Sequence, residues 1–403
     1  MRLLRTSPAY TRLLVAHTIS PLGDAMATTA LILHLQETTG TATSVGILLF
    51  AEAVPPLATP LAGAVADRVH PGRLLAAGFL AQAAVMGVLA VWLPSLAGIV
   101  ALVFLRSLFE TPLAPAVGRA IPAVVADADL ATANALRGGV RELGTVIGPP
   151  LAGVLFVASG ARLVLAVDAV TFVLAIPLVL GLPRLKPVDG PTGETVRRSL
   201  VADARDGLVL LWRSPVTRAV ALGFWVVVLF SATDDLILAF LAADTFGGGP
   251  VAVGVLLAAA SVGLLLGLPA VGPVARRLRV TTAIVVGFGV MSAANLATAA
   301  APGLAAAVVA QIARGSAIPL ADTFVTTHVQ RTTPPAFLGR VLANVYGGVG
   351  VAAAAGYLLG GPVLDATSPR LTFVFVGAGG LLGTALTALL VRRAAHRDAF
   401  TPS

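Results

Sequence analysis

The sequence predicts an all-α membrane protein with twelve transmembrane helices, arranged as two pseudo-symmetric six-helix bundles. Three observations carry this prediction. Of the 403 residues, 57% are hydrophobic and 11% are charged, whereas soluble domains carry roughly 25% charged residues. The apolar residues gather into segments of about 20 residues or more, the length that a helix needs to cross the hydrocarbon core. Short stretches of the first half also recur in the second half.

Twelve segments have the length and composition of a membrane span. Proline, glycine and short polar clusters separate most of them, as turns between helices require. The predicted spans are residues 12–36, 44–67, 73–94, 96–121, 137–159, 162–182, 216–242, 250–274, 280–301, 303–329, 337–364 and 370–392.

One long polar connection, from Pro183 to Pro215, separates the sixth span from the seventh. It divides the chain into an N-terminal bundle (residues 1–182), a linker (183–215) and a C-terminal bundle with a short tail (216–403). Within the linker, Ser199 to Trp212 has the apolar spacing of an amphipathic helix on a membrane surface.

Three pairs of stretches recur in the same order, about 208 to 212 residues apart. They are SVGILLFA at Ser44 with AVGVLLAA at Ala252, FLRSLFETPLA around Arg106 with IARGSAIPLA around Arg314, and IGPPLAG at Ile147 with LGGPVLD at Leu359. Each pair falls on equivalent spans. This order predicts duplicated bundles of the kind found in secondary transporters.

The basic residues predict the orientation in the membrane. If the N-terminus is cytoplasmic, all but four of the 27 Lys and Arg residues fall on that side. Arg162 and Arg370 lie outside, and Arg106 and Arg314 lie within spans. Because basic residues concentrate on the cytoplasmic side, we expect both termini in the cytoplasm of a bacterium and the chain in its inner membrane.

Several function classes are disfavoured. The net charge of +8 is spread between spans rather than clustered as in nucleic-acid binders. The lone lysine, Lys186, precedes Pro187, so no phosphate-binding loop of the ATPase type is present. Cysteine is absent and the five histidines are scattered, so we expect no metal site, no cofactor and no enzymatic activity.

The charged stretch GAVADRVHPGR, residues 63–73, joins the second and third spans. Gly63, Asp67, Arg68 and Arg73 resemble the loop signature of the major facilitator superfamily, whose fold has two six-helix bundles. The resemblance implies that Gly63 allows close helix approach and that Asp67 latches the cytoplasmic side shut against the eleventh helix. The alternative is that these charges only set topology.

The spacing of this loop is similar to that of enterobactin-exporter-like and macrolide-efflux-like members of the superfamily. The sequence departs from them at His70, Pro71 and Gly72, and the second half has Arg276 in place of Asp67. We therefore expect any latch to be asymmetric.

The fifth span contains GTVIGPPLAG, residues 144–153, with small residues four apart and a proline pair that is expected to kink the helix. Gly144, Gly148, Pro149 and Gly153 resemble the Gly-Pro signature of the superfamily's exporters. Ordinary close packing of glycines is the alternative.

Charged residues inside spans are candidates for proton coupling or for the substrate cavity, because a charge at mid-bilayer costs ~2.5 kcal/mol or more. Arg106 and Glu110 form an i,i+4 pair on the fourth span, and Arg106 resembles the superfamily's proton-linked arginine. Arg314 and Asp322 occupy the related tenth span. A purely structural role is the alternative for both pairs.

Five more embedded residues are acidic. We predict that Asp24 on the first span carries the coupling proton, tuned by Arg106 and Glu110, with Asp234 and Asp235 on the seventh span as the next candidates. Polar packing is the alternative. Glu52 and Asp168 are also embedded and receive no predicted role.

Together these patterns predict a monomeric secondary transporter driven by the proton gradient. It is expected to export a hydrophobic and cationic small molecule, such as a drug, macrolide or siderophore, by alternating access. Its expected partners are that substrate, protons and the lipid bilayer, with no nucleic acid. The alternatives are a nutrient importer or facilitator and a transporter-like sensor or scaffold.

Overall fold

The computed structural model describes residues 2–182 and 193–398, and all regular structure in these ranges is helical. Contacts divide the chain into two compact units. Unit 1 comprises Met1–Gly40, Ile47–Arg197 and Gly249–Ala258, and unit 2 comprises Thr41–Gly46, Arg198–Gly248 and Ala259–Ser403.

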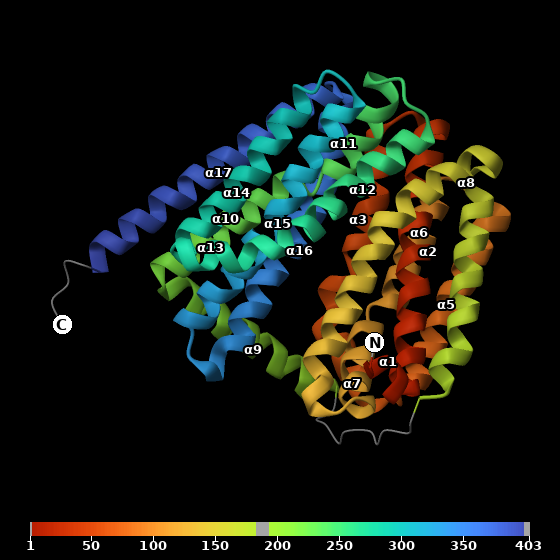
Figure 1. Cartoon of the computed structure of the whole chain (residues 1–403), viewed down its shortest axis with the longest axis horizontal. Helices are drawn as coiled ribbons and strands as arrows, with labels where there is room; N and C mark the ends of the chain where they lie inside the picture. The colour runs from red at the N-terminus through yellow and green to blue at the C-terminus, as the bar shows by residue number, and fades with distance from the viewer. Residues whose placement is uncertain (1, 183–192, 399–403) are drawn as a thin grey trace. The chain divides into compact units, whose positions relative to one another are not determined.

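Most of unit 1 is built from helices of the first half of the chain (Figure 1). They are α1 (Arg2–Thr6), α2 (Pro8–Thr39), α3 (Ala42–Ala53), α4 (Thr59–Arg68), α5 (Pro71–Trp92), α6 (Leu96–Glu110), α7 (Leu113–Val124) and α8 (Leu130–Leu180), with the first turns of α3 belonging to unit 2. α8 packs along both α2 and α5. This contact uses small residues, since a Cβ atom on Gly148 would lie 2.7 Å from Ala25 Cβ.

The helices of the second half form most of unit 2. They are α9 (Gly193–Arg213), α10 (Pro215–Ser231), α11 (Asp234–Phe240), α12 (Pro250–Gly267), α13 (Val271–Arg277), α14 (Val280–Ala299), α15 (Leu304–Thr332), α16 (Leu338–Asp365) and α17 (Pro369–Asp398). Their core includes Phe224 stacked on Phe288, with ring centroids 5.7 Å apart. α9 supplies the helix expected in the linker, while residues 183–192 lie outside the described part.

Among the described residues, ten helical segments are long and apolar enough to cross a membrane. They are Ala42–Gly63, Pro71–Trp92, Leu96–Val124, Asp127–Leu180, Pro215–Thr245, Pro250–Arg277, Val280–Ala299, Leu304–Thr332, Pro335–Asp365 and Pro369–Ala394. α2 is 32 residues long and is not among them.

α8 contains nearly all residues of two predicted spans, 137–159 and 162–182. If straight, its 51 residues would extend about 75 Å, more than twice the ~30 Å hydrocarbon core. The helix is interrupted at Gly160, where φ is 68° and ψ is −171°. Only glycine adopts such angles readily, and Figure 1 shows the yellow ribbon of α8 turning back on itself.

Four segments predicted as single spans contain breaks. The second predicted span is interrupted at Pro55–Ala58, and the eighth is interrupted at Leu268–Ala270. The fourth predicted span is interrupted at Thr111 and Pro112. Proline lacks a backbone N–H and disfavours a continuous helix, which explains these three breaks. Residues 241–245 of the seventh span form a π turn. The backbone angles stay helical through Pro149 and Pro150, so the expected kink there does not appear as a break in α8.

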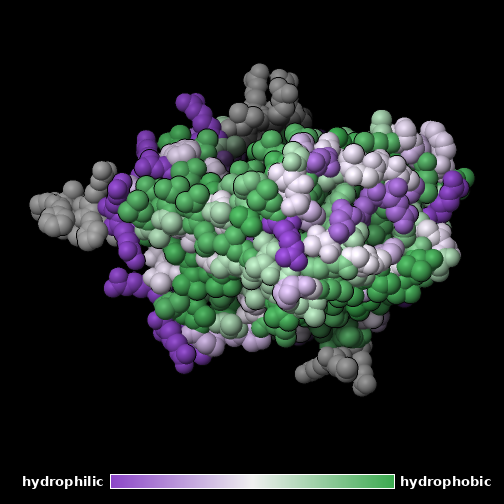
Figure 2. Space-filling view, turned by 90° about the horizontal axis from the view of Figure 1, so that it is seen from above, coloured by the Kyte–Doolittle hydropathy of each residue, from purple (hydrophilic) through white to green (hydrophobic). Residues whose placement is uncertain are grey.

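Large apolar side chains face outward on both units. On α8, Val157 is 65% exposed and Leu174 is 55% exposed. Figure 2 shows a face dominated by green hydrophobic residues, with the hydrophilic ones in separate purple patches. Exposed apolar area of this extent marks contact with lipid or another apolar partner.

Candidate functional site

A buried arginine in unit 1 lies among three carboxylates. Arg106 on α6 forms ion pairs with Asp24 on α2 and with Glu52 on α3. Its Nη1 atom also lies 3.7 Å from Glu110 Oε2, one turn further along α6. The i,i+4 pair predicted from the sequence is therefore present, within a larger group that we call the Arg106 cluster (Asp24, Glu52, Arg106 and Glu110).

Hydroxyl groups orient the carboxylates of this cluster. Thr28 Oγ1 on α2 donates to Glu52 Oε1 at 3.2 Å, and Ser20 Oγ donates to Asp24 Oδ2 at 3.4 Å. Ser107 Oγ donates to the Glu52 backbone carbonyl at 2.8 Å. The positions of both carboxylates are thus tied to the helices around Arg106.

The charges of the Arg106 cluster do not balance. Three carboxylates share one guanidinium, and their contact with water differs from that of the arginine. The Arg106 side chain is 3% exposed, whereas Asp24, Glu52 and Glu110 are 21%, 26% and 49% exposed. An excess of negative charge on partly accessible oxygens favours the binding of a proton or another cation.

Glu52 is a functional candidate to which the sequence assigned no role. The signal that could have found it is its position as an embedded carboxylate, since such groups face a cavity or pair with another charge. Its pairing with Arg106 depends on how α3 and α6 pack, which spacing along the chain does not reveal.

A fourth carboxyl group lies directly behind the cluster. Asp168 in the second leg of α8 is fully buried, and Thr171 Oγ1 donates to its Oδ1 at 3.2 Å. Its Oδ2 has no hydrogen-bond partner among the described residues. A Cβ atom on Gly23 would overlap Asp168 Oδ1, so only glycine fits beside Asp24 on this face of α2.

The corresponding ion pair in unit 2 has one positive and one negative charge and is buried away from water. Arg314 on α15 pairs with Asp234 on α11, and these side chains are 10% and 1% exposed. Asn295 Nδ2 donates to Asp234 Oδ1 at 3.3 Å, and Arg314 Nη2 donates to the Ser231 carbonyl at 3.3 Å. One guanidinium therefore meets one carboxylate, out of reach of solvent.

The other two acidic candidates of unit 2 do not join this pair. Asp235 is half-buried beside Asp234 but does not share the ion pair. Asp322 lies two turns beyond Arg314 on α15, is exposed, and accepts a hydrogen bond from Tyr346 Oη at 2.7 Å.

The structure describes only part of the charged stretch at residues 63–73. Gly63 lies on α4, and a Cβ atom there would meet nothing within 4 Å among the described residues, so its predicted role in a close helix approach stays a prediction. Arg68 and Arg73 are exposed. The side chain of Asp67 lies outside the described part of the structure.

The C-terminal end of α4 has a partner that the sequence did not suggest. The guanidinium of Arg119 on α7 donates to the Ala66 carbonyl. Carbonyl groups in the last turn of a helix lack intrahelical partners and favour a cation. Arg119 therefore holds this loop within unit 1.

The glycines of the fifth span make the close contacts expected of small residues. A Cβ atom on Gly144 would lie 3.1 Å from the Leu22 nitrogen. On Gly153 it would lie 2.5 Å from the Pro250 carbonyl oxygen and 2.8 Å from Val251 Cα, and Gly254 of α12 meets Pro149. The first turn of α12 is thus packed backbone to backbone against α8.

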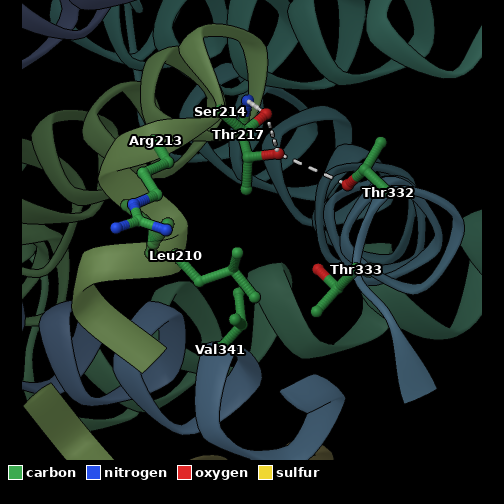
Figure 3. A pocket seen from close by; sticks show the side chains of 8 residues that line it. Leu210, Arg213, Ser214, Thr217, Thr332, Thr333 and Val341 are labelled. Carbon is green, nitrogen blue, oxygen red and sulfur yellow. Dashed lines mark hydrogen bonds between the residues drawn. The ribbon is translucent and has the colours of Figure 1, made fainter. Parts of the chain in front are cut away.

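Figure 3 shows a pocket in unit 2 that contains none of the charged candidates. Ser214 Oγ donates to Thr217 Oγ1 at 2.9 Å, and Thr217 Oγ1 lies 3.3 Å from Thr332 Oγ1. These hydroxyls satisfy one another at the start of α10. The residues lining the pocket are Leu210, Leu211, Arg213, Ser214, Thr217, Thr332, Thr333 and Val341.

Two curated proteins resemble the chain in sequence. The multidrug efflux pump Tap of Mycolicibacterium fortuitum is 27% identical over 276 residues, which are 68% of this chain and 65% of Tap. This chain therefore spans just under two thirds of Tap. The uncharacterized MFS-type transporter y4rN of Sinorhizobium fredii (strain NBRC 101917 / NGR234) is 28% identical over 349 residues, or 85% of each chain.

Solved structures share the fold at low sequence identity. The nucleoside transporter NupG superposes with a TM-score of 0.75 at 13% identity, covering 98% of this chain and 100% of NupG. The peptide transporter POT in complex with sulfate superposes with a TM-score of 0.77 at 14% identity, covering 97% of this chain and 95% of POT.

The family model described as Major Facilitator Superfamily matches residues 13–242 and 223–403, which together extend over nearly all of the described helices. The described residues contain ten apolar helices of spanning length, and the relatives are transporters, so both findings agree with a family of multi-pass membrane transporters. The chain belongs to the Major Facilitator Superfamily.

Proposed function

We propose that this protein is a proton-coupled exporter of hydrophobic, cationic small molecules that works by alternating access. The observation that carries the proposal is the charge imbalance of the Arg106 cluster, in which three partly exposed carboxylates share one buried guanidinium. A proton and an organic cation would compete for the same excess negative charge, and this competition is what an exchanger needs.

The exchange would take place mainly at Asp24 and Glu52. Protonation of either carboxyl would weaken the hold of the cluster on a bound cation. A proton that enters from the outside would therefore release the cargo there, and loss of the proton to the cytoplasm would restore cation binding. The proton gradient supplies the energy, and no cofactor takes part.

The proposed architecture has twelve spans. α2 is long enough to cross the bilayer at 32 residues, and the turn at Gly160 would make α8 two spans. Residues 1–182 and 216–403 would then form the two six-helix bundles and 183–215 the cytoplasmic linker. Both termini would lie in the cytoplasm of a bacterium, and the chain would span its inner membrane. The protein would work as a monomer.

Efflux is supported by the similarity to the pump Tap and by the close packing of the Gly-Pro stretch of α8. Import is the second candidate, because the solved structures that share the fold include nucleoside and peptide transporters. A sensor or scaffold function has no comparable support.

The experiment uses everted membrane vesicles that are acidified inside, with ethidium, tetraphenylphosphonium, erythromycin and enterobactin as probes. The proposal predicts that at least one cationic probe accumulates and that a protonophore abolishes the accumulation. Accumulation only in right-side-out vesicles would indicate import instead. If none of the probes binds or accumulates, the substrate class is wrong.

The variants Asp24→Asn and Glu52→Gln test the site. Both should lose accumulation against a gradient while keeping normal expression. Glu37→Gln removes an exposed carboxylate from α2 outside the cluster and should behave as wild type. Wild-type affinity for the cation should fall from pH 8.5 to pH 5.5, and the double variant Asp24→Asn/Glu52→Gln should lose this dependence.

A further inference from the structure

The pocket in Figure 3 lies where two membrane-spanning segments end, and all of its lining residues belong to unit 2. The spanning segment Pro215–Thr245 begins two residues after Arg213. The segment Leu304–Thr332 ends directly before Thr333. Because a spanning helix leaves the hydrocarbon core at its ends, the pocket lies at the level of the lipid headgroups.

The size and walls of the pocket suit a small polar group with an apolar remainder. Its volume is about 210 Å³, below the roughly 300–1,000 Å³ of pockets that hold drug-sized ligands. Figure 3 shows Arg213 on one side of the pocket and Thr333 on the other, with the apolar side chains of Leu210 and Val341 along the lower edge. The polar groups thus flank an apolar wall.

Two donor groups of the pocket lack a partner within the described part of the chain. Thr217 Oγ1 lies 3.3 Å from Thr332 Oγ1, which donates to the His328 carbonyl at 2.8 Å. The Arg213 guanidinium and the Thr333 hydroxyl, by contrast, have neither a hydrogen bond nor an ion pair to a described residue. A guanidinium has five N–H donors and no acceptor, so these groups favour an anion.

The acidic side chains of α9 do not neutralise Arg213. Asp203 Oδ1 lies 2.9 Å from Arg340 Nη2, and Asp206 Oδ2 lies 3.5 Å from Arg340 Nη1. These ion pairs dock α9 on α16. The positive charge of Arg213 at the rim of the pocket therefore stays available to a ligand.

Another face of α9 carries the apolar side chains of Leu208, Val209 and Trp212, all of them exposed. The Arg218 guanidinium lies over the Trp212 ring, 5.8 Å from its centroid. Tryptophan is enriched at the membrane–water interface, and arginine buries its apolar stem there while its charge stays at the surface. Leu208, Val209 and Trp212 therefore offer an apolar surface close to Arg213 along the chain.

We propose that this pocket binds the headgroup of an anionic phospholipid. The Arg213 guanidinium and the Thr333 hydroxyl hold its phosphate, and its acyl chains lie along Leu208, Val209 and Trp212. A lipid fits better than a free phosphate ion, because the donors lie at headgroup level beside exposed apolar side chains. The site fastens the linker helix α9 to the membrane surface, and it depends neither on proton coupling nor on the direction of transport.

Quenching of tryptophan fluorescence by brominated lipids measures binding at this position. The full chain is placed in phosphatidylcholine nanodiscs that contain increasing amounts of brominated phosphatidylglycerol or, separately, brominated phosphatidylcholine. Trp92 and Trp225 are the other tryptophans, so the signal of Trp212 is the part that Trp212→Phe removes. The wild type should associate with phosphatidylglycerol at least fivefold more strongly than with phosphatidylcholine, as one arginine near the surface supports.

Arg213→Gln should lower this preference about fivefold, and Thr333→Val should weaken the association of both lipids by removing a donor to the phosphate. Arg277→Gln removes an exposed arginine of α13 that does not line the pocket and should keep the wild-type preference. Equal quenching by the two lipids in the wild type overturns the proposal, as does an unchanged preference in Arg213→Gln. Loss of the preference in excess inorganic phosphate at constant ionic strength also overturns it, because a free anion would then be the occupant.

Discussion

Asp24→Asn and Asp234→Asn make the same chemical change at repeat-related positions, and we expect them to affect different properties. Asp234 is 1% exposed and is the ion-pair partner of Arg314. Without its carboxylate, the buried guanidinium keeps the Ser231 carbonyl at 3.3 Å. Removal of one partner of a buried pair costs about 3–5 kcal/mol.

Asp24 is one of three carboxylates around Arg106. Glu52 and Glu110 still balance the guanidinium after the substitution, and the Asp24 side chain is 21% exposed. We therefore expect Asp24→Asn to change the free energy of unfolding by no more than about 1 kcal/mol, and to abolish coupled transport.

Thermal unfolding of the purified variants in one detergent measures this contrast. At roughly 2–4 °C per kcal/mol for a unit of this size, Asp234→Asn should lower the Tm by roughly 10 °C, and Asp24→Asn by a few degrees at most. Adding Arg314→Leu to Asp234→Asn removes the unpaired charge and should recover most of the loss. Equal losses in the two single variants, or a larger loss in Asp24→Asn, would refute this distinction between the two sites.

Three further predictions follow from other parts of the chain. Gly153→Ala places a Cβ atom 2.5 Å from the Pro250 carbonyl oxygen and should cost about 1–3 kcal/mol by overpacking, whereas Gly118→Ala, with nothing within 4 Å, should not lower the Tm. Single cysteines at Thr39 and Ala126 should react with an impermeant maleimide from outside and from inside respectively, and the reverse pattern would overturn the topology. Asp67→Asn should slow transport at normal expression if the carboxylate latches the cytoplasmic side, and unchanged transport would leave the loop with a role in topology alone.

Features with short-range causes could be predicted from the sequence. The apolar segments follow from composition, the Arg106–Glu110 pair from helical spacing, and the tight packing of Gly144 and Gly153 from the spacing of small residues in the fifth span. In each case the determining residues lie within a few helical turns of one another, so their relation is set by helix geometry.

Features that depend on packing between distant helices could not be predicted from the sequence. Glu52 joins Arg106, Arg119 reaches Ala66, and Asp365 caps α3 from the far end of the chain. The sealed burial of Asp234, compared with the partly open Asp24, also depends on how each unit packs.

The central claim is that a proton and an organic cation compete for the Arg106 cluster, and proton release on binding tests it most directly. Purified protein in weakly buffered detergent at pH 7 is mixed with tetraphenylphosphonium, and with tetraphenylborate as an anion of matched shape. We predict that the cation binds and releases protons, that the anion does neither, and that Asp24→Asn/Glu52→Gln abolishes the release. Binding of the cation to the wild type with no proton release, or release that persists undiminished in the double variant, would contradict the claim.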